Sequence, residues 1–166
     1  MEAMFHQVLV TECDQHYLRF LWWDNGDLSS EPQKYCVTRH IFGATSSPSC
    51  ASYCLQRTAH DHADDYPPEV IQSVLQNFYV DDFLKSTPDV ASAVQMIPQV
   101  TALLGTGSFN LTKFLSNSHQ VLLTIPKEKK APSVKQHAID HKLPFERALG
   151  IKWDVEEDAF LYTITP

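Results

Sequence analysis

Two adjacent carboxylates, Asp81 and Asp82, are the residues whose types and spacing point most directly to chemistry. Apolar residues flank the pair, with NFYV before it and FL after it, which is typical of a short strand, a charged turn and a returning strand. Like charges this close disfavour joint ionisation, and a divalent cation removes that cost. Mg²⁺ suits the pair because it binds one or two protein carboxylates and fills its other positions with water and substrate phosphate. A solvated hairpin turn without a ligand is the alternative.

A second cluster of ligand-type residues lies in the segment HDHADD at 60–65. His60 and His62 are two residues apart, so they do not share a helix face as the i, i+4 histidine pair of metalloproteases does. We expect a solvated loop here. A zinc hydrolase centred on these two histidines is the alternative, and it would hold stoichiometric zinc.

The elements that must position these residues mix helices with antiparallel strands. Apolar spacing, caps and proline starts predict helices over 46–58, from 67 onwards and over 89–104, the last kinked or ended early by Pro98. Aromatic and β-branched runs predict strands over 17–23, 35–42, 77–80, 83–84, 121–125, 148–153 and 159–162, with an Asn25-Gly26 turn between the first two. Residues 2–10 suit a short helix or a helical turn. Helices and strands mixed without strict alternation indicate the α+β class.

Composition restricts the function classes further. The chain has 166 residues, 43% of them hydrophobic, and a formal net charge of −7 from 13 basic and 20 acidic residues. These values indicate one globular domain rather than a disordered chain. The sequence lacks both a run of ~20 apolar residues and a secretory signal, so we expect a soluble, intracellular, cytoplasmic protein without a membrane partner. The acidic balance disfavours a free-standing nucleic-acid binder.

Two further features fit more than one role. The four cysteines show no C-x-x-C spacing, and we expect reduced, buried thiols rather than a disulfide or zinc site. The basic run KEKK at 127–130, with Lys135, either touches a nucleic-acid backbone or forms a solvated loop.

Five segments, in chain order, resemble the motifs of one known family. They are EAMFHQV at 2–8, IFGATSSP at 41–48, NFYVDD at 77–82, GSFNLTKFLSN at 107–117 and RALGIKWD at 147–154. In order and spacing they resemble the palm of reverse transcriptases, and within that family the retroelements of the BEL/Pao type. The resemblance implies a palm-like antiparallel sheet with packed helices. It divides the chain into a partial palm over 1–125 and the end of the palm, with primer-grip-like strands, over 126–166.

The activity that this resemblance implies is RNA-directed DNA polymerisation by two-metal nucleotidyl transfer, with Mg²⁺, or Mn²⁺ as a substitute. Its partners would be an RNA or DNA template with a primer, and deoxynucleotides. A full element of this type would be particle-associated in the cytoplasm.

The resemblance also assigns roles to single residues. It implies that Asp81 and Asp82 are catalytic metal ligands, and that Lys113 protonates the departing pyrophosphate. The nucleotide-binding residues that it implies are Phe5, Phe42 and Gly43. The residues that it implies along primer and template are Tyr79, Val80, Ser47, Pro48, Leu149 and Gly150. Simpler roles stay open for three of these residues: core packing for Phe5, helix capping for Ser47 and a solvated surface position for Lys113.

The chain departs from the family pattern at its start. The family's first catalytic aspartate should precede Phe5 by five residues, which is the position directly before Met1. We therefore expect little or no polymerase activity from these residues alone. The central palm strand would be missing as well, which would leave an open strand edge beside the Asp81-Asp82 hairpin and favour self-association. The alternative function is a non-catalytic retroelement remnant that acts as a nucleic-acid- or protein-binding module.

Overall fold

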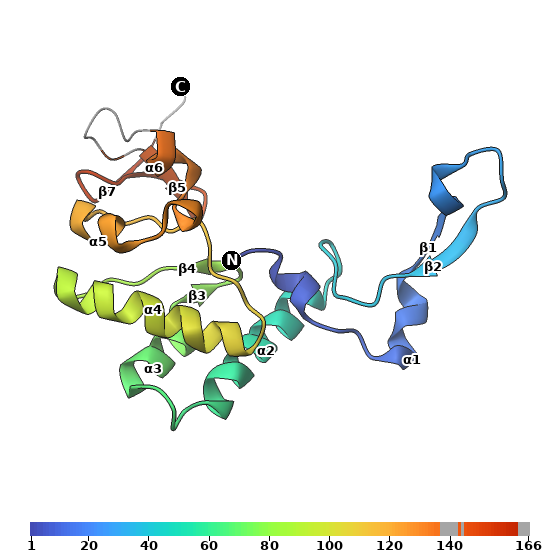
Figure 1. Cartoon of the computed structure of the whole chain (residues 1–166), viewed down its shortest axis with the longest axis horizontal. Coiled ribbons are helices and arrows are strands. Elements are labelled where there is room, and N and C mark those ends of the chain that lie inside the picture. The colour runs from blue at the N-terminus through green and yellow to red at the C-terminus, as the bar shows by residue number, and fades with distance from the viewer. Residues whose placement is uncertain (137–142, 144, 163–166) are drawn as a thin grey trace.

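The computed structural model describes residues 1–136, 143 and 145–162. The helices and 3₁₀ turns are η1 Met4–Gln7, α1 Glu12–Gln15, η2 His16–Leu18, η3 Asp24–Gly26, α2 Ser47–Asp61, α3 Pro68–Gln76, α4 Val90–Thr106, α5 His119–Thr124, η4 Lys127–Lys129 and α6 Pro132–Gln136. The strands are β1 Arg19–Trp22, β2 Gln33–Cys36, β3 Phe78–Tyr79, β4 Asp82–Phe83, β5 Phe145–Ala148, β6 Ile151–Asp154 and β7 Ala159–Leu161. They pair antiparallel in three small sheets, β1–β2, β3–β4 and β5–β6–β7. The predicted α+β class is confirmed (Figure 1).

The main core lies where α2, α3 and α4 pack against one another. On α3, Val70, Ile71 and Val74 are buried, and their i, i+1, i+4 spacing places them on one helix face. Leu55 of α2 and Leu103 of α4 are buried in the same cluster. The helix predicted from residue 67 onwards is therefore confirmed, and it buries one apolar face.

Helix α4 joins the main core to a second, smaller apolar cluster. It begins after Asp89, whose carboxylate caps the helix by accepting a hydrogen bond from the Ser92 N–H at 2.8 Å. The helix continues through Pro98 to Thr106, so the expectation that the proline ends it early is wrong. One missing main-chain hydrogen bond is outweighed here because α4 packs on both apolar clusters. None of the described helices, α4 included, is long and apolar enough to cross a bilayer.

The end of α4 lies very close to α2. A Cβ atom added at Gly107 would lie 2.3 Å from Thr58 Oγ1 and 3.2 Å from a ring carbon of Phe109. Only a residue without a side chain permits this approach. Gly107 therefore sets how closely the two helices pack.

Residues 121–125 were predicted as a strand, and this prediction is wrong. Helix α5 begins after Ser118, whose hydroxyl accepts a hydrogen bond from the Val121 N–H at 3.4 Å. Val121, Leu122 and Ile125 are buried together and form the second cluster with half-buried residues of α4. A short apolar run does not distinguish a strand from a helix by its period, and the serine cap and the contact with α4 decide between them.

The predicted single strand over 148–153 is also corrected, because a turn divides it into β5 and β6. Leu149 and Gly150 have φ values of 52° and 84°, in the left-handed region that a tight two-residue hairpin turn requires. The register pairs Ala148 with Ile151 across this turn. The last predicted strand is confirmed as β7, which pairs with β6.

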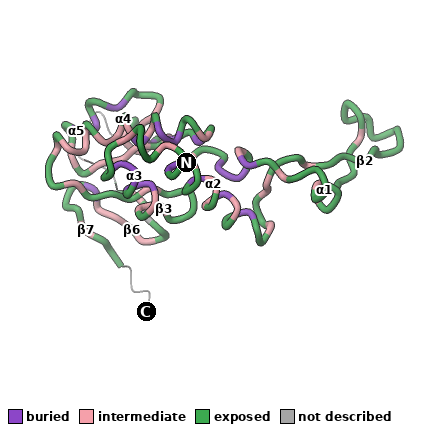
Figure 2. The backbone as a smooth tube through the Cα atoms, turned by 90° about the horizontal axis from the view of Figure 1, so that it is seen from below, coloured by how far each residue is buried: buried purple, intermediate pink, exposed green. Residues whose placement is uncertain are grey.

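Residues 11–40 form an arm that projects away from the helical body (Figure 1). The predicted antiparallel pairing is confirmed for β1 with β2, but the second strand ends at Cys36, so its predicted extension to residue 42 is wrong. Asn25 and Gly26 lie in a 3₁₀ turn within a longer connection. No residue of the arm is buried, as the green colour of this region in Figure 2 shows. The arm is therefore a two-stranded sheet without a second layer.

The expectation of buried thiols is wrong. Cys13 and Cys36 are exposed in the arm, whereas Cys50 and Cys54 are half-buried on α2. All four thiols are free, and partial burial raises the pKa of the Cys54 thiol. Cys36 has the apolar neighbours Tyr35 and Val37 in sequence, but neither is buried in a core, and Cys13 lies between Glu12 and Asp14.

Candidate active site

The β3–β4 hairpin packs its base against the main core and carries Asp81 and Asp82 at its tip. Phe78 and Phe83 are register partners whose ring centroids lie 4.9 Å apart, and both rings pack against the main core. Both carboxylates are exposed at the tip. The predicted strand, turn and returning strand are confirmed, and the apolar flanks hold the base of the hairpin while its tip stays open.

The turn of this hairpin contains a strained residue. Val80 has a φ of 54°, and a β-branched side chain in the left-handed region costs on the order of 1–3 kcal/mol. Its neighbour Tyr79 is 66% exposed, so both residues predicted along the primer lie on the open part of the hairpin. Strain of this kind persists only where the surrounding structure holds it, and it is concentrated at functional sites.

The first residues of the chain lie beside the hairpin tip. The Met1 amino group donates a hydrogen bond to the Asp81 carbonyl oxygen at 2.6 Å. The next residue, Glu2, forms an antiparallel bridge with Asn110 and accepts a hydrogen bond from its side-chain amide at 2.6 Å. The hairpin, the N-terminal segment and the segment that leads to Lys113 are therefore neighbours.

Lys113 is held in its place by the residues on both sides of it. Leu111 is buried in the main core, and the Phe114 N–H donates a hydrogen bond to the Lys129 carbonyl at 2.8 Å. Between these two anchors Lys113 is exposed, with a φ of 57°. Lys129, from the basic run, also donates through Nζ to the Leu111 carbonyl at 3.4 Å, so this lysine supports the segment.

Asp81, Asp82 and Lys113 line one open groove of about 1370 Å³. Its apolar floor comes mainly from one face of α4, with Val90, Ala93, Met96, Ile97 and Val100. The volume exceeds the range of about 300–1,000 Å³ that is usual for small-molecule sites. Carboxylates that can hold a divalent cation and an ammonium group that can contact phosphate therefore face a space that is large enough for a polymer.

The opposite wall of the groove belongs to the β5–β6–β7 sheet. Arg147, Trp153 and Asp158 line it. Asp158 accepts hydrogen bonds from Trp153 Nε1 at 3.1 Å and from the Asn117 side chain at 3.0 Å, which ties the sheet to the segment before α5. The sequence prediction omitted Arg147 and Trp153 as site residues, although both belong to the motif RALGIKWD, because it selected only Leu149 and Gly150 within that motif.

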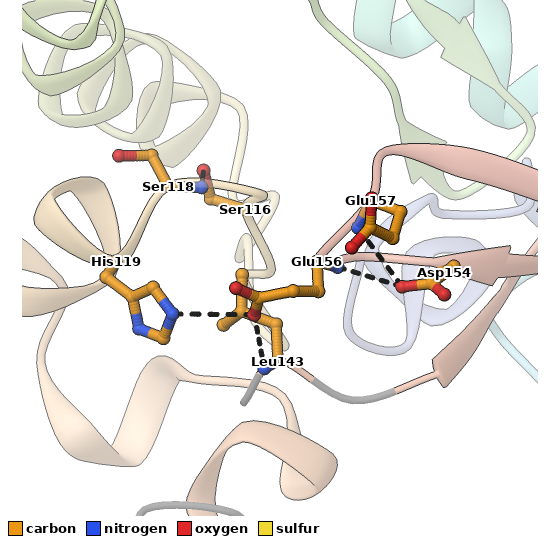
Figure 3. A network of polar contacts seen from close by, with 7 residues as sticks. All are labelled: Ser116, Ser118, His119, Leu143, Asp154, Glu156 and Glu157. Atoms are coloured by element: carbon orange, nitrogen blue, oxygen red, sulfur yellow. Dashed lines mark hydrogen bonds and ion pairs between the residues drawn. The ribbon is translucent and has the colours of Figure 1, made fainter. Parts of the chain in front are cut away.

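A second polar network holds this wall against α5 (Figure 3). The Glu156 carboxylate accepts a hydrogen bond from the Leu143 N–H at 2.8 Å and lies 3.6 Å from His119 Nε2. Asp154 accepts hydrogen bonds from the main-chain N–H groups of Glu156 and Glu157, which shapes the turn between β6 and β7. The sheet that carries Arg147 is thus fixed at two points.

The predicted nucleotide-binding residues lie near the start of α2 instead. Phe5 is buried in the main core, edge-on to Phe42, with ring centroids 4.8 Å apart. Phe42 is 67% exposed, and Gly43 has a φ of 87° in the adjacent turn. The structure brings these residues together, but the groove wall as described does not include them. The core-packing role left open for Phe5 fits its burial.

The remaining predicted contacts are divided between two places. Ser47 is fully buried, with its hydroxyl 3.3 Å from His40 Nδ1, and Pro48 follows it in the first turn of α2. Ser47 does not cap α2, because the cap position belongs to Ser46, whose side chain makes no capping hydrogen bond. Leu149 and Gly150 are exposed in the β5–β6 turn, and neither lines the groove.

The donors at the hairpin tip fit Mg²⁺ better than zinc. Within the part of the chain that the structure describes, no group of three or more His, Cys, Asp or Glu side chains is placed to hold an ion. Two adjacent carboxylates match the small number of protein ligands that Mg²⁺ takes, whereas zinc needs three or four. In the histidine cluster, His62 Nδ1 lies 2.9 Å from Asp65 Oδ2, a local contact within the turn after α2.

Comparison of the chain with protein families, with curated proteins and with solved structures finds no match. Any functional conclusion therefore rests on the geometry of the groove and on the motifs in the sequence.

Proposed function

We propose that this chain is a palm region of a reverse transcriptase of the BEL/Pao type and that its groove serves template-directed nucleotidyl transfer. One observation carries the proposal. Asp81, Asp82 and Lys113, which come from two separate sequence motifs, line the same groove. In this reaction the protein must position the metal ions and contact the phosphate groups.

The position of the N-terminal segment supports the same conclusion. Since the Met1 nitrogen lies 2.6 Å from the Asp81 carbonyl oxygen, a residue joined directly before Met1 would lie next to the hairpin tip. The resemblance expects a further catalytic aspartate at this position. In this proposal a third carboxylate would therefore lie beside Asp81 and Asp82.

The side chains of the groove divide the chemistry among them. Asp81 and Asp82 would hold Mg²⁺, or Mn²⁺, which when bound stabilises charge on the attacking and leaving oxygens. Lys113 would donate a proton to the leaving pyrophosphate. Arg147, on the opposite wall, presents a guanidinium group that can bind a phosphate through two parallel hydrogen bonds.

In this proposal the hairpin, with α2 and α4 beneath it, is the palm, and the β5–β6 hairpin approaches the primer. Its partners are a primed RNA or DNA template and deoxynucleotides. The volume of the groove favours such a polymeric substrate. We expect weak activity or none from these residues alone, because the described site offers two carboxylates and no third donor beside them.

A non-catalytic binding module is the second candidate, and one observation favours it. Phe42 and Gly43, which the resemblance assigns to the nucleotide, lie outside the described groove wall, and Phe5 is buried. A chain that retained the fold but lost catalysis would keep the core role of Phe5 without needing the other two residues.

Primer extension on an RNA template with Mg²⁺ or Mn²⁺ tests the proposal. Three proteins are compared: the chain itself, the Asp81→Asn/Asp82→Asn variant, and a version with an aspartate-containing segment joined before Met1. We expect extension only from the lengthened version, and its loss when the Asn pair is introduced there. Direct Mn²⁺ binding, measured by electron paramagnetic resonance, should fall in the Asn pair of either version.

The matched control is Asp64→Asn/Asp65→Asn, which removes the same charge from another exposed adjacent pair. This control should leave both Mn²⁺ binding and extension unchanged. Equal losses from the two Asn pairs would mean that net charge, and not the hairpin site, causes the effect. Activity that survives the loss of Asp81 and Asp82 would contradict the proposed site.

A further inference from the structure

The basic run KEKK at 127–130, with Lys135, has no role in the reaction proposed above. Two of its four lysines are engaged within the chain: Lys129 Nζ donates a hydrogen bond to Asn110 Oδ1 at 3.1 Å, and Lys135 Nζ donates to the Glu128 carbonyl at 3.0 Å. A nucleic-acid backbone would have to compete with these partners for the two ammonium groups. The contacts therefore favour a role within the chain.

The main chain of this run lies along the segment that carries Lys113. The Phe114 N–H donates a hydrogen bond to the Lys129 carbonyl at 2.8 Å, and the Ala131 N–H donates to the Phe114 carbonyl at 2.9 Å. Together these bonds form a parallel bridge. We call residues 127–131 the strap, because they bind the residue directly after Lys113.

Side chains connect the strap to the N-terminal segment. Asn110 Nδ2 donates a hydrogen bond to the Glu2 carboxylate at 2.6 Å, and Asn110 Oδ1 accepts the bond from Lys129 Nζ. A carboxylate only accepts and an ammonium group only donates, so the two charges fix the orientation of the amide between them. The Glu2 N–H also donates to the Asn110 carbonyl at 3.0 Å. Three segments that are distant in sequence therefore meet at one amide group.

The backbone of Lys113 needs such support. Its φ of 57° lies in the left-handed region, which a residue other than glycine keeps only where the surrounding structure holds it. Leu111, two residues before it, is buried in the main core, and Phe114, directly after it, is bound by the strap. Without the strap, Lys113 would keep one anchor of two, and its ammonium group would lose its fixed place in the groove.

We propose that Glu2, Asn110 and Lys129 are positioning residues, which hold the strap against the Lys113 segment and so place the Lys113 ammonium group in the groove. The chemistry of Lys113 rests on the proposed function, whereas the positioning concerns the fold alone. All three side chains are at least partly exposed, so their network contributes little to global stability. Its effect is local, on where Lys113 lies.

The same N-terminal segment reaches the other part of the site. The Met1 nitrogen lies 2.6 Å from the Asp81 carbonyl oxygen, and the next residue, Glu2, belongs to the network. One short segment thus contacts both the hairpin that carries the carboxylates and the network that holds the strap. The network therefore sets the position of Lys113 relative to these carboxylates.

Hydrogen exchange of the full chain, followed by NMR at the Phe114 and Ala131 amides, tests the positioning. Asn110→Leu and Lys129→Met each break the network and should speed exchange at these two amides at least about fivefold. The matched control, Lys127→Met, removes the same charge from an exposed position in the strap and should change the rates less than about twofold. Circular dichroism of each variant establishes that the body stays folded.

A charge swap tests the part played by the amide. Glu2→Lys and Lys129→Glu should each speed exchange, because each sets a like charge or a wrong group against Asn110. The double variant should recover most of the wild-type protection, because the amide can rotate by half a turn and offer its oxygen to the new lysine and its NH₂ group to the new glutamate. In an Asn110→Leu background the swap should bring no recovery.

Primer extension by the version lengthened before Met1 tests the consequence for the reaction. Asn110→Leu should lower kcat at least about tenfold and change the KM for primed template less than about twofold, because Lys113 is misplaced while template binding is kept. If the basic run instead contacts nucleic acid, Lys127→Met and Lys129→Met should raise this KM equally and leave kcat unchanged.

Four results would overturn the positioning role. They are unchanged exchange in both network variants, an equal effect of the Lys127→Met control, no recovery in the charge swap, and faster exchange with an unchanged kcat. A lengthened chain without any activity would overturn the enzymatic proposal alone, because the exchange rates would still decide whether the network holds the strap.

Discussion

The helical body and the arm contain similar apolar residues but differ in what those residues contact. In the body, Leu103 and Val74 are buried between three helices that pack on one another. In the arm, Leu21 and Trp22 are more than half exposed because the two strands have no second layer. An apolar side chain therefore stabilises a fold only where another element covers it. The body therefore has a buried core of its own, whereas residues 11–40 contain no buried residue.

Leucine truncation tests this difference with the largest expected effect. Leu103→Ala should lower the free energy of unfolding by about 3 kcal/mol, because it removes a fully buried side chain and leaves a cavity. Leu21→Ala, the matched change in the arm, should lower it by less than about 0.5 kcal/mol, because this side chain is 57% exposed. Urea unfolding measures both values. Equal losses would mean that the arm and the body unfold as one unit.

Glycine substitution at the end of α4 should have the next largest effect. Gly107→Ala would place its methyl group 2.3 Å from Thr58 Oγ1, so either the Thr58 side chain or the packing of α2 against α4 must shift. We expect a loss of about 1–3 kcal/mol, as for other overpacked cores. Gly105→Ala is the control, since nothing lies within 4 Å of a Cβ there and alanine should stabilise the helix by about 0.5–1 kcal/mol. Thermal unfolding distinguishes the loss of stability expected for Gly107→Ala from the gain expected for Gly105→Ala. A Gly107→Ala variant that is as stable as the wild type would show that the helices are less tightly packed.

Backbone strain offers a smaller contrast between the same two regions. Val80 in the body and Asn25 in the arm both have a φ of 54°. Val80→Gly should raise the stability by about 1 kcal/mol, because glycine adopts this conformation without cost. Asn25→Gly should change it little, because asparagine already tolerates the left-handed region. Val80→Ala, which keeps most of the strain, should not reproduce the gain. A stabilising Val80→Gly that also reduces primer extension by the lengthened chain would link the strain to function.

Acid titration should show the smallest effect. A hydrogen bond from the main-chain N–H of Ser92 lowers the pKa of Asp89, the cap of α4, below its ordinary 3.8. At the arm tip, a side-chain hydrogen bond from Ser29 lowers the pKa of Asp27 as well. A carboxyl group whose pKa is depressed in the folded state stabilises that state above its unfolded pKa, and this contribution is lost as the pH falls through the folded pKa.

Only the Asp89 contribution should reach the global stability, because α4 belongs to the core and the arm tip does not. Asp89→Asn, which keeps a capping oxygen but does not titrate, should therefore reduce the acid-induced loss of stability below pH 3.8. Asp27→Asn should leave it unchanged. Stability curves measured against pH for both variants check the contrast, and an equal response would again mean that arm and body are coupled.

Local patterns in the sequence were sufficient for much of this fold. The 70, 71, 74 spacing of α3, the Asp89 cap of α4 and the hairpin around Asp81 and Asp82 are each set by residues a few positions apart. The α+β class follows from such segments. The same approach failed for 121–125, where a serine cap and contact with α4 outweigh the strand-like run of apolar residues.

Long-range contacts decided what the local patterns left open. The sequence indicates that Asp81 and Asp82 occupy a hairpin tip, but only packing brings Met1, Lys113 and Arg147 to the groove beside them. The aromatic residues of β1 are strand-forming in any context, and only the missing second layer leaves them exposed. Side-chain period and capping depend on neighbours along the chain, whereas burial and the assembly of a site depend on segments that are distant in sequence.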